Sequence, residues 1–471
     1  MKQKKLPNII YIISDEHRGQ AMGHAGDENL KTPNMDRLAM DGVSFSRAYC
    51  NCPLCTPSRG TIFSGRHAHC GPISTASETF KASFPSTAHH LRKAGYHTAY
   101  LGKWHGGMVT NQNPPEVRAN PEDYPGSHNR TPERHRAGFQ DWRANEHASN
   151  QFKSYYYHDR EINPRKLPGY DTDGFTDLAI DYMQNYDREE PLFLVLSVMP
   201  PHFPFLVPEE FNRFDPSELI LRPNFDPPEL FGKAKTLECL ALYYAMIENL
   251  DWNIGRLMDA IGKLPEFENT LTIYTSDHGE YLGCHRQYVG KAHAHEESVR
   301  IPMIFHWPDR IAPTGENSSL ISLVDLQSTV LGLLGIEQPV YDQGFDCSGI
   351  IAGEDTGGQD AVLIEMSGNV HTSLQVMDWR GVITRDWKYA FYENGYEVIF
   401  NLTEDPYEME NLAGKLPEKQ AELKTLLLKL LNEANEPFFD VMIKYGIPPE
   451  NPDIDVSRDP IFAGIEEYYE S

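Results

Sequence analysis

The feature that most constrains this chain is a repeated alternation of short apolar runs with segments of helical periodicity. The apolar runs span residues 8–13, 98–101, 192–198, 271–275 and 303–307. The segments with helical spacing span residues 32–41, 86–93 and 237–261, and a last helix is expected over 320–334. Strands that alternate with helices are typical of an α/β domain built on a mostly parallel sheet. We therefore predict this fold class for the larger part of the chain.

The length and the pattern after residue 355 favour more than one domain. We predict a large domain over residues 1–355, a small α+β domain over 360–435 and an irregular tail over 436–471. The small domain has three short alternating runs and then a helix at 417–432, so an antiparallel sheet with one helix is expected. Within the large domain, residues 106–171 are too long for a plain connection and read as an insertion that shapes a pocket.

The insertion is rich in cationic side chains, which suit anionic groups on a substrate or serve only to keep an exposed loop soluble. Its arginines include Arg118, Arg130, Arg134, Arg136 and Arg143. The chain as a whole carries a formal net charge of -26, which argues against a nucleic-acid partner or an anionic membrane. No apolar run is long enough to span a membrane.

The N-terminus and the cysteines give an expectation for the compartment. A basic start at residues 1–5 passes into a short apolar run with no small-residue cleavage site, so we expect no signal peptide and a cytoplasmic chain. A leader removed beforehand would instead make the protein periplasmic or secreted. The chain has 7 cysteines, an odd number that fits a reducing compartment better than a disulfide framework.

Acidic residues follow two of the predicted strands. Asp15 and Glu16 come after the run at 8–13, and Asp277 and His278 come after the run at 271–275. Ligands of open α/β sheets gather at the carboxyl ends of strands, so these side chains are expected to meet there. Carboxylates with one imidazole suit a hard divalent cation such as calcium or magnesium, and manganese is also compatible. The alternative is that the acids only cap the helices that follow.

Basic residues lie beside other predicted strands. Lys103 and His105 follow the run at 98–101, His202 follows the run at 192–198, and Lys291 precedes a charged stretch at 296–300. Lysine supplies a fixed positive charge and histidine a proton carrier near neutral pH. Each taken alone fits a structural histidine or a solvated charge. Their shared position next to strands favours one common pocket.

Cys55 belongs to a segment that reads Cys55-Thr56-Pro57-Ser58-Arg59 and continues to Ser64-Gly65-Arg66. Thr56 is a suitable N-cap and Pro57 a suitable first helical residue, which places Cys55 at the start of a helix. Free backbone N–H groups there suit an oxyanion such as sulfate and lower the pKa of a thiol. The other interpretation is a thiolate metal cluster of Cys50, Cys52, Cys55 and Cys70, although their spacing lacks the paired C-x-x-C pattern.

The segment from Cys55 to Arg66 resembles the signature of the type I, formylglycine-dependent sulfatases. Further blocks in that family's order are residues 6–16, 32–38, 102–105, 201–202, 276–280 and 291–302, and residues 385–389 and 405–412 are similar to its small second domain. The resemblance implies an alkaline-phosphatase-like fold, in which helices sandwich a large, mostly parallel mixed sheet. It also implies a smaller C-terminal antiparallel sheet with a helix.

The same resemblance implies a role for each matching residue. A maturation enzyme would oxidise Cys55 to formylglycine, whose hydrated aldehyde is the nucleophile and a ligand of the metal. The other metal ligands would be Asp15, Glu16, Asp277 and His278. Arg59 would hold the formylglycine, Lys103 and Lys291 would bind sulfate oxygens, His105 would help release the sulfate from the enzyme, and His202 would protonate the leaving alcohol.

The function implied is a sulfuric ester hydrolase that uses one divalent cation, calcium before magnesium or manganese, on a sulfated carbohydrate. Two positions depart from the family pattern: Glu16 stands where Asp or Gln is usual, and His278 where Asn is frequent. A histidine there also occurs in relatives that cleave phosphonate or phosphate esters, which is the first alternative. The second is a catalytically silent binding protein, against which the complete residue set argues. Assembly as a homo-oligomer is left open.

Overall fold

The computed structural model describes residues 6–106, 126–127, 130–230, 232–287, 289–354, 357–367 and 377–434. The predicted tail at 436–471 lies outside the described residues, as do residues 107–125 of the predicted insertion, Arg118 among them. Among the helices described, none combines the length and the apolar character that crossing a membrane requires.

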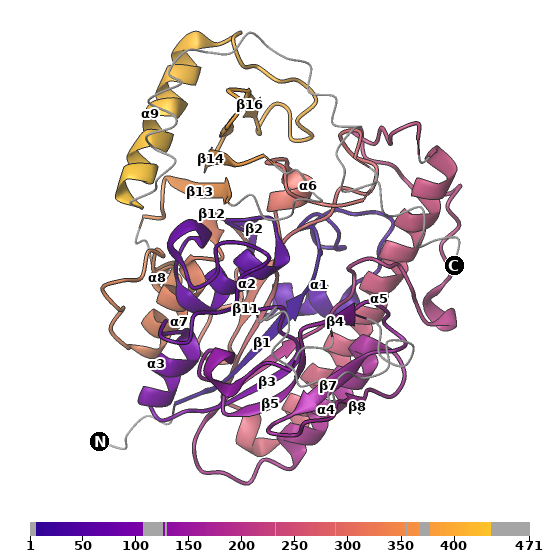
Figure 1. Cartoon of the computed structure of the whole chain (residues 1–471), viewed down its shortest axis with the longest axis vertical. Helices are drawn as coiled ribbons and strands as arrows, with labels where there is room; N and C mark the ends of the chain where they lie inside the picture. The colour runs from indigo at the N-terminus through magenta and orange to yellow at the C-terminus, as the bar shows by residue number, and fades with distance from the viewer. Residues whose placement is uncertain are drawn as a thin grey trace.

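A ten-stranded mixed sheet forms the centre of the molecule, in the order β12-β2-β11-β10-β1-β9-β3-β5-β7-β8 (Figure 1). The strands from β10 to β5 in this order run parallel to their neighbours, whereas β11 and β7 pair antiparallel. The strands of this sheet are β1 Asn8–Ser14, β2 Val43–Tyr49, β3 His97–Lys103, β5 Asp141–Asn145, β7 Tyr155–His158, β8 Arg165–Lys166, β9 Leu192–Ser197, β10 Thr270–Ser276, β11 Met303–His306 and β12 Gly315–Ser322. A separate short pair joins β4 Gly126–Ser127 to β6 His147–Ala148.

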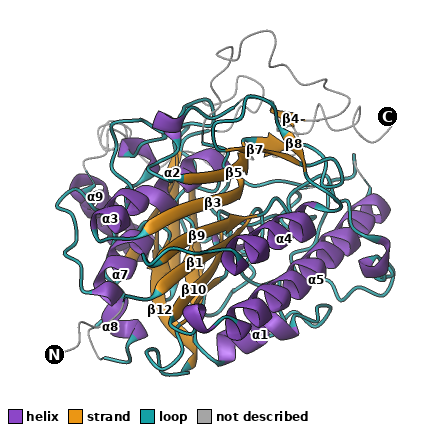
Figure 2. Cartoon of the chain, turned by 90° about the horizontal axis from the view of Figure 1, so that it is seen from below, coloured by secondary structure: helices purple, strands orange, loops and turns teal. Residues whose placement is uncertain are grey.

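Helices cover both faces of this sheet (Figure 2). One side carries α1 Pro33–Met40, α4 Asp171–Gln184 and α5 Lys233–Lys263. The other side carries α2 Cys55–Ser64, α3 Thr87–Lys93, α7 Asp325–Leu334 and α8 Ser348–Ile351. The short helix α6 Glu296–Val299 precedes β11.

The sequence of β1 explains why it lies in the middle of the sheet. Ile9, Tyr11 and Ile13 point into the core beneath α2, α3 and α7. Ile10 and Ile12 point into the opposite core beneath α1, α4 and α5. Side chains alternate between the faces of a strand, so a run that is apolar at every position requires burial on both sides.

The C-terminal part forms a four-stranded antiparallel sheet and one helix (Figure 1). Its elements are β13 Ala361–Met366, β14 Trp379–Thr384, β15 Trp387–Tyr392, β16 Glu397–Asn401 and α9 Pro417–Glu433. Leu423, Leu427 and Leu431 share one face of α9 and pack on the outer face of this sheet. The inner face, with Val362 and Trp379, joins the core of the large sheet. The predicted fold class is thus confirmed for both parts.

The prediction of a last helix in the large domain was wrong. The single helix expected over 320–334 is a strand, β12, followed by α7 from Asp325. The Asp325 carboxylate accepts hydrogen bonds from the Ser322 amide at 2.7 Å and the Ser322 hydroxyl at 3.0 Å, and so holds the turn between them. No strand was predicted within the insertion, and the structure shows that this segment contributes β5, β7 and β8 to the sheet.

Candidate active site

The register of β1 and β10 brings the two acidic pairs together. These strands are parallel and end level, with Ser14 opposite Ser276, so the next residues leave the sheet side by side. Asp15 and Asp277 are both fully buried there, and the Glu16 amide donates to the Asp277 carboxylate at 3.3 Å. Buried carboxylates need compensating positive charge. The edge of the sheet is therefore built to attract cations.

Cys55 reaches this edge from the first turn of α2. The helix begins at Cys55 itself, with the extended residue Leu54 as N-cap and its carbonyl accepting the first helical bond from Ser58 at 3.0 Å. The prediction that Thr56 is the N-cap was wrong, since its hydroxyl has no hydrogen-bond partner among the described residues. The consequence for Cys55 is unchanged, because it still lies at a helix N-terminus.

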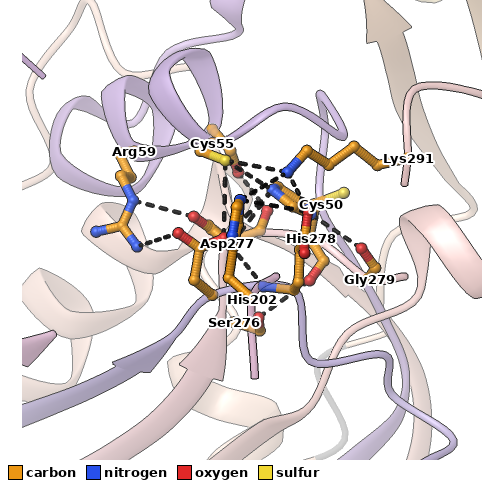
Figure 3. A network of polar contacts seen from close by, with 12 residues as sticks. Cys50, Cys55, Arg59, His202, Ser276, Asp277, His278, Gly279 and Lys291 are labelled. Atoms are coloured by element: carbon orange, nitrogen blue, oxygen red, sulfur yellow. Dashed lines mark hydrogen bonds and ion pairs between the residues drawn. The ribbon is translucent and has the colours of Figure 1, made fainter. Parts of the chain in front are cut away.

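In Figure 3, several of the dashed contacts end at the Cys55 sulfur. It is 3.1 Å from Nε2 of His278, 3.4 Å from Nζ of Lys291 and 3.7 Å from a carboxylate oxygen of Asp15. Burial opposes ionisation of this thiol, but Lys291, Lys103 and His278 together hold the pKa of Cys55 well below its usual range. The side chain is thus held in an electropositive environment that suits a nucleophile.

Four of the predicted metal ligands form one compact group. Ligand atoms of Asp15, Cys55, Asp277 and His278 all lie within 4.8 Å of one another. Nδ1 of His278 donates to the Gly279 carbonyl at 2.9 Å, which leaves Nε2 facing the group, 3.6 Å from Asp15 and 3.7 Å from Asp277. A backbone acceptor on the second ring nitrogen is the usual way to orient a ligand histidine. The donor set fits a divalent cation that accepts oxygen and nitrogen.

Glu16 points to a different side of the site. Its backbone has a φ of 66°, and its carboxylate forms an ion pair with Lys291 and lies 3.6 Å from Nε2 of His202. The Phe203 amide contacts the other carboxylate oxygen at 3.4 Å. Burial raises the pKa of Glu16, but His202 and Lys291 outweigh it and hold this pKa below its usual value. Glu16 therefore belongs to a second possible ligand group, with Asp15 and His202, which shares only Asp15 with the compact four.

Arg59 ties the two strand ends and α2 together. Its Nε donates to Asp277 at 3.0 Å and its Nη2 lies 3.4 Å from Asp15. Its Nη1 donates to the Lys103 carbonyl and to the Ser197 hydroxyl, both at 2.8 Å. The guanidinium is buried and uses its planar fork on two carboxylates at once.

Lys103 ends β3 and forms an ion pair with Asp15. The preceding Gly102 has a φ of 107°, and a Cβ built on it would lie 1.7 Å from the Ser197 carbonyl oxygen. Only glycine allows β3 and β9 to approach this closely where both meet Arg59. Lys103 at the end of β3 thus pairs with Asp15, and Lys291, from the segment between β10 and α6, pairs with Glu16.

The two predicted histidines also reach the site. His105 hydrogen bonds to the Cys55 side chain, and burial together with Lys103 lowers the pKa of His105 to about 4. Nε2 of His202 is 3.3 Å from Nζ of Lys291, and its backbone carbonyl accepts from Gln151 at 2.9 Å. His105 is therefore neutral near pH 7. His202 is partly open to solvent, with 16% of its side chain exposed.

All ten residues predicted from the sequence are brought to one edge of the sheet: Asp15, Glu16, Cys55, Arg59, Lys103, His105, His202, Asp277, His278 and Lys291. The thiolate cluster is not found among the described residues, where the ligand groups contain Cys55 without Cys50, Cys52 or Cys70.

Sequence reasoning missed three contributors. Ser58 donates to the Asp277 carbonyl at 2.5 Å, and Ser197 accepts from Arg59. The ring of His147 packs against both His105 and His202. Ser58 is in the recognised segment, and Ser197 ends a predicted strand. The position of His147 follows from the register of β5 on β3. It could not be recognised from the sequence, because β5 itself was not predicted.

Comparison with known proteins agrees with this geometry. The family model described as Sulfatase matches residues 7–336, and the model described as N-sulphoglucosamine sulphohydrolase, C-terminal, matches residues 283–436. The ulvan-active sulfatase of Formosa agariphila is 31% identical over an alignment of 447 residues that covers 92% of this chain and 82% of the relative. The N-acetylglucosamine-6-O-sulfatase of Bacteroides thetaiotaomicron is 26% identical, covering 93% of this chain and 88% of the relative.

Among solved structures, YidJ from Bacteroides fragilis superimposes with a TM-score of 0.84 at 27% identity, covering 94% of this chain and 98% of that one. The large mixed sheet with its smaller antiparallel sheet is thus an alkaline-phosphatase-like architecture. Within that class the chain belongs to the sulfatase family and is an enzyme, a sulfuric ester hydrolase.

Proposed function

We propose that this enzyme hydrolyses a sulfate ester of a carbohydrate, with the side chain of residue 55 as nucleophile and a divalent cation beside it. The observation that supports this best is the position of Cys55, whose sulfur lies within 3.7 Å of His278, Lys291 and Asp15. The proposal of a carbohydrate substrate rests on two relatives, which are named an ulvan-active sulfatase and an N-acetylglucosamine-6-O-sulfatase.

Oxidised to formylglycine and hydrated, residue 55 would offer two hydroxyl groups, one to attack sulfur and one to expel sulfate and restore the aldehyde. Arg59 would orient this side chain through Asp15 and Asp277, which it already holds. His105, which hydrogen bonds to residue 55, is neutral near pH 7 and can accept a proton from one of those hydroxyls. One water is consumed in each cycle.

A calcium, magnesium or manganese ion held by Asp15, Asp277, His278 and residue 55 would supply positive charge next to the sulfuryl group. Glu16 is proposed to support this group through Lys291 and to ligate the ion only if its side chain turns. Lys103 and Lys291 bring two further positive charges to the sulfuryl oxygens.

The leaving group needs a proton, because an alkoxide is a poor leaving group at neutral pH. His202 is the candidate, since its Nε2 faces Lys291 and Glu16 and its side chain is partly exposed. Glu16 lies 3.6 Å from this nitrogen, and a protonated His202 would donate its proton to the ester oxygen.

The test is sulfate release from a panel of sulfated sugars and aryl sulfates, with phosphate and phosphonate esters alongside. The protein is co-expressed with a formylglycine-generating enzyme, and mass spectrometry of the peptide that contains residue 55 reports the oxidation. We expect sulfate release from a sugar, lost in Cys55→Ala. A folded, oxidised enzyme that releases no sulfate would contradict the proposal.

A phosphonate or phosphate ester hydrolase is the second candidate, and His278 in the ligand group is the observation that favours it. The same panel separates the two, because faster turnover of a phosphonate ester than of every sulfate ester would move the assignment to this activity.

A further inference from the structure

Two neighbouring strands deliver histidines to the site at equivalent positions. β3 and β5 are parallel, Lys103 is opposite Asn145, and the Trp104 amide extends the pairing to the Asn145 carbonyl at 2.7 Å. His105 and His147 each lie two residues beyond that pair. Their rings consequently stack, with centroids 5.2 Å apart and planes 18° from parallel.

The third histidine comes from the strand on the other side of β3. β9 pairs with β3 so that Ser197 is opposite Gly102, and His202 follows β9 in a loop. The ring of His147 meets that of His202 edge to face, with centroids 5.7 Å apart. His147 thus touches both histidines to which the mechanism assigns proton transfer.

One nitrogen of the His147 ring, Nδ1, is buried and lacks a hydrogen-bond partner among the described residues. Burial, Lys103 and His105 all lower the pKa of His147, so the ring is neutral and offers one donor and one acceptor. A buried ring nitrogen without a partner is costly, and a ligand that pairs with it recovers that cost. The ring therefore suits an uncharged polar group better than a second sulfate.

We propose that His147 is a substrate-binding residue that hydrogen bonds to a hydroxyl of the leaving sugar and holds the ester oxygen toward His202. This inference rests on the proposed function, since it assigns a place to the sugar in the same pocket. Lys103 and Lys291 provide the charge for the sulfuryl oxygens, whereas His147 adds none. The ligand class is thus an alcohol with a free hydroxyl near its ester, as in a sugar sulfate, rather than a simple aryl sulfate.

The experiment compares His147→Phe and His147→Gln with the wild-type enzyme. Phe keeps an aromatic ring against His105 and His202 but cannot hydrogen bond, and Gln keeps a donor and an acceptor. His158→Phe is the matched control, because His158 ends the adjacent strand β7 and pairs with the surface acids Asp159 and Glu161. The substrates are para-nitrophenyl sulfate and the sulfated sugar of the panel that the wild type cleaves fastest.

We expect His147→Phe to lower kcat/KM for the sugar roughly 10-fold to 100-fold, the range for one lost buried hydrogen bond. The loss on the aryl sulfate should be several-fold smaller, and His147→Gln should recover part of the sugar activity. His158→Phe should keep the wild-type ratio of sugar to aryl activity. Urea unfolding midpoints check that each variant folds, and His147→Leu, which also cannot hydrogen bond, replaces His147→Phe if the Phe variant does not fold.

Two results would overturn the inference and are distinguishable from each other. An unchanged ratio of sugar to aryl activity in both variants at position 147, with an active wild type, would reduce His147 to a packing residue and leave the proposed function intact. Failure of the wild type on all sulfate esters would remove the proposed function, and this inference with it.

Discussion

Replacement of Arg59 tests whether the cluster is held by charge compensation. Arg59→Leu removes the side chain that contacts Asp277 at 3.0 Å and Asp15 at 3.4 Å, both fully buried. It also removes the donors to the Lys103 carbonyl and the Ser197 hydroxyl, both at 2.8 Å. Two carboxylates then share the remaining positive charge of the cluster.

The magnitude follows from these contacts. Breaking a buried ion pair from one side costs about 3–5 kcal/mol in the free energy of unfolding, because a buried charge loses its partner. Arg59→Lys keeps the charge but replaces the planar fork by a point donor, so it should cost less, about 2–3 kcal/mol for the lost hydrogen bonds. A divalent cation offsets the same carboxylates, so its addition should recover more stability in Arg59→Leu than in the wild type.

The assay is urea unfolding at neutral pH, with and without calcium. Arg37→Leu is the control, because Arg37 pairs with Asp41 at 3.8 Å on the exposed face of α1, with 72% of its own side chain accessible. That substitution should change the free energy of unfolding by no more than about 0.5 kcal/mol. A cost below about 1 kcal/mol for Arg59→Leu would refute the reasoning, since the carboxylates would not depend on the guanidinium.

Three further outcomes are expected. Dialysis against EDTA should abolish sulfate release and lower the unfolding temperature, and single additions of calcium, magnesium or manganese should identify the ion that restores both; full activity after chelation would argue against a metal. Burial raises the pKa of Asp251 to about 6. The folded state thus favours the protonated carboxyl of Asp251. The stability that this adds is fully present below the pKa that Asp251 has in the unfolded chain, and it is lost as the pH rises through about 6. The stability of the wild type relative to Asp251→Asn should fall by about 2–3 kcal/mol from about pH 4 to about pH 7, and a difference independent of pH would contradict this. Trp379 donates to the Ala292 carbonyl at 2.7 Å beside Lys291. Trp379→Phe should therefore cost about 1–3 kcal/mol in urea unfolding and lower kcat/KM, whereas Trp387→Phe on the same small sheet should leave kcat/KM unchanged.

Much of the fold was predictable because its central strands are apolar at nearly every position. Such runs, as in β1 and β9, need burial on both faces and so fix a sheet between two layers of helices. The strand β12 was missed because its buried residues Leu320 and Ile321 are continuous in sequence with those of α7, and periodicity cannot divide them. The strands β5 and β7 were missed because they are short and lie in a segment rich in polar residues.

The sequence by itself identified the candidate residues of the site. Cys55 with Arg59, the acids after two strands and the lysines and histidines beside others could all be recognised from residue type and position. Chemistry at a strand end depends on the side chain and the strand, and both are local properties of the sequence.

Only the tertiary structure decided which of these residues contact one another. Glu16 pairs with Lys291 and lies beside Asp15 and His202, and it is not part of the compact group that contains Cys55, Asp277 and His278. His147 joins the site through the register of β5 on β3, a relation between residues that share no local pattern. Which side chains meet depends on the pairing of strands that are far apart in the sequence. This pairing cannot be read from any single segment.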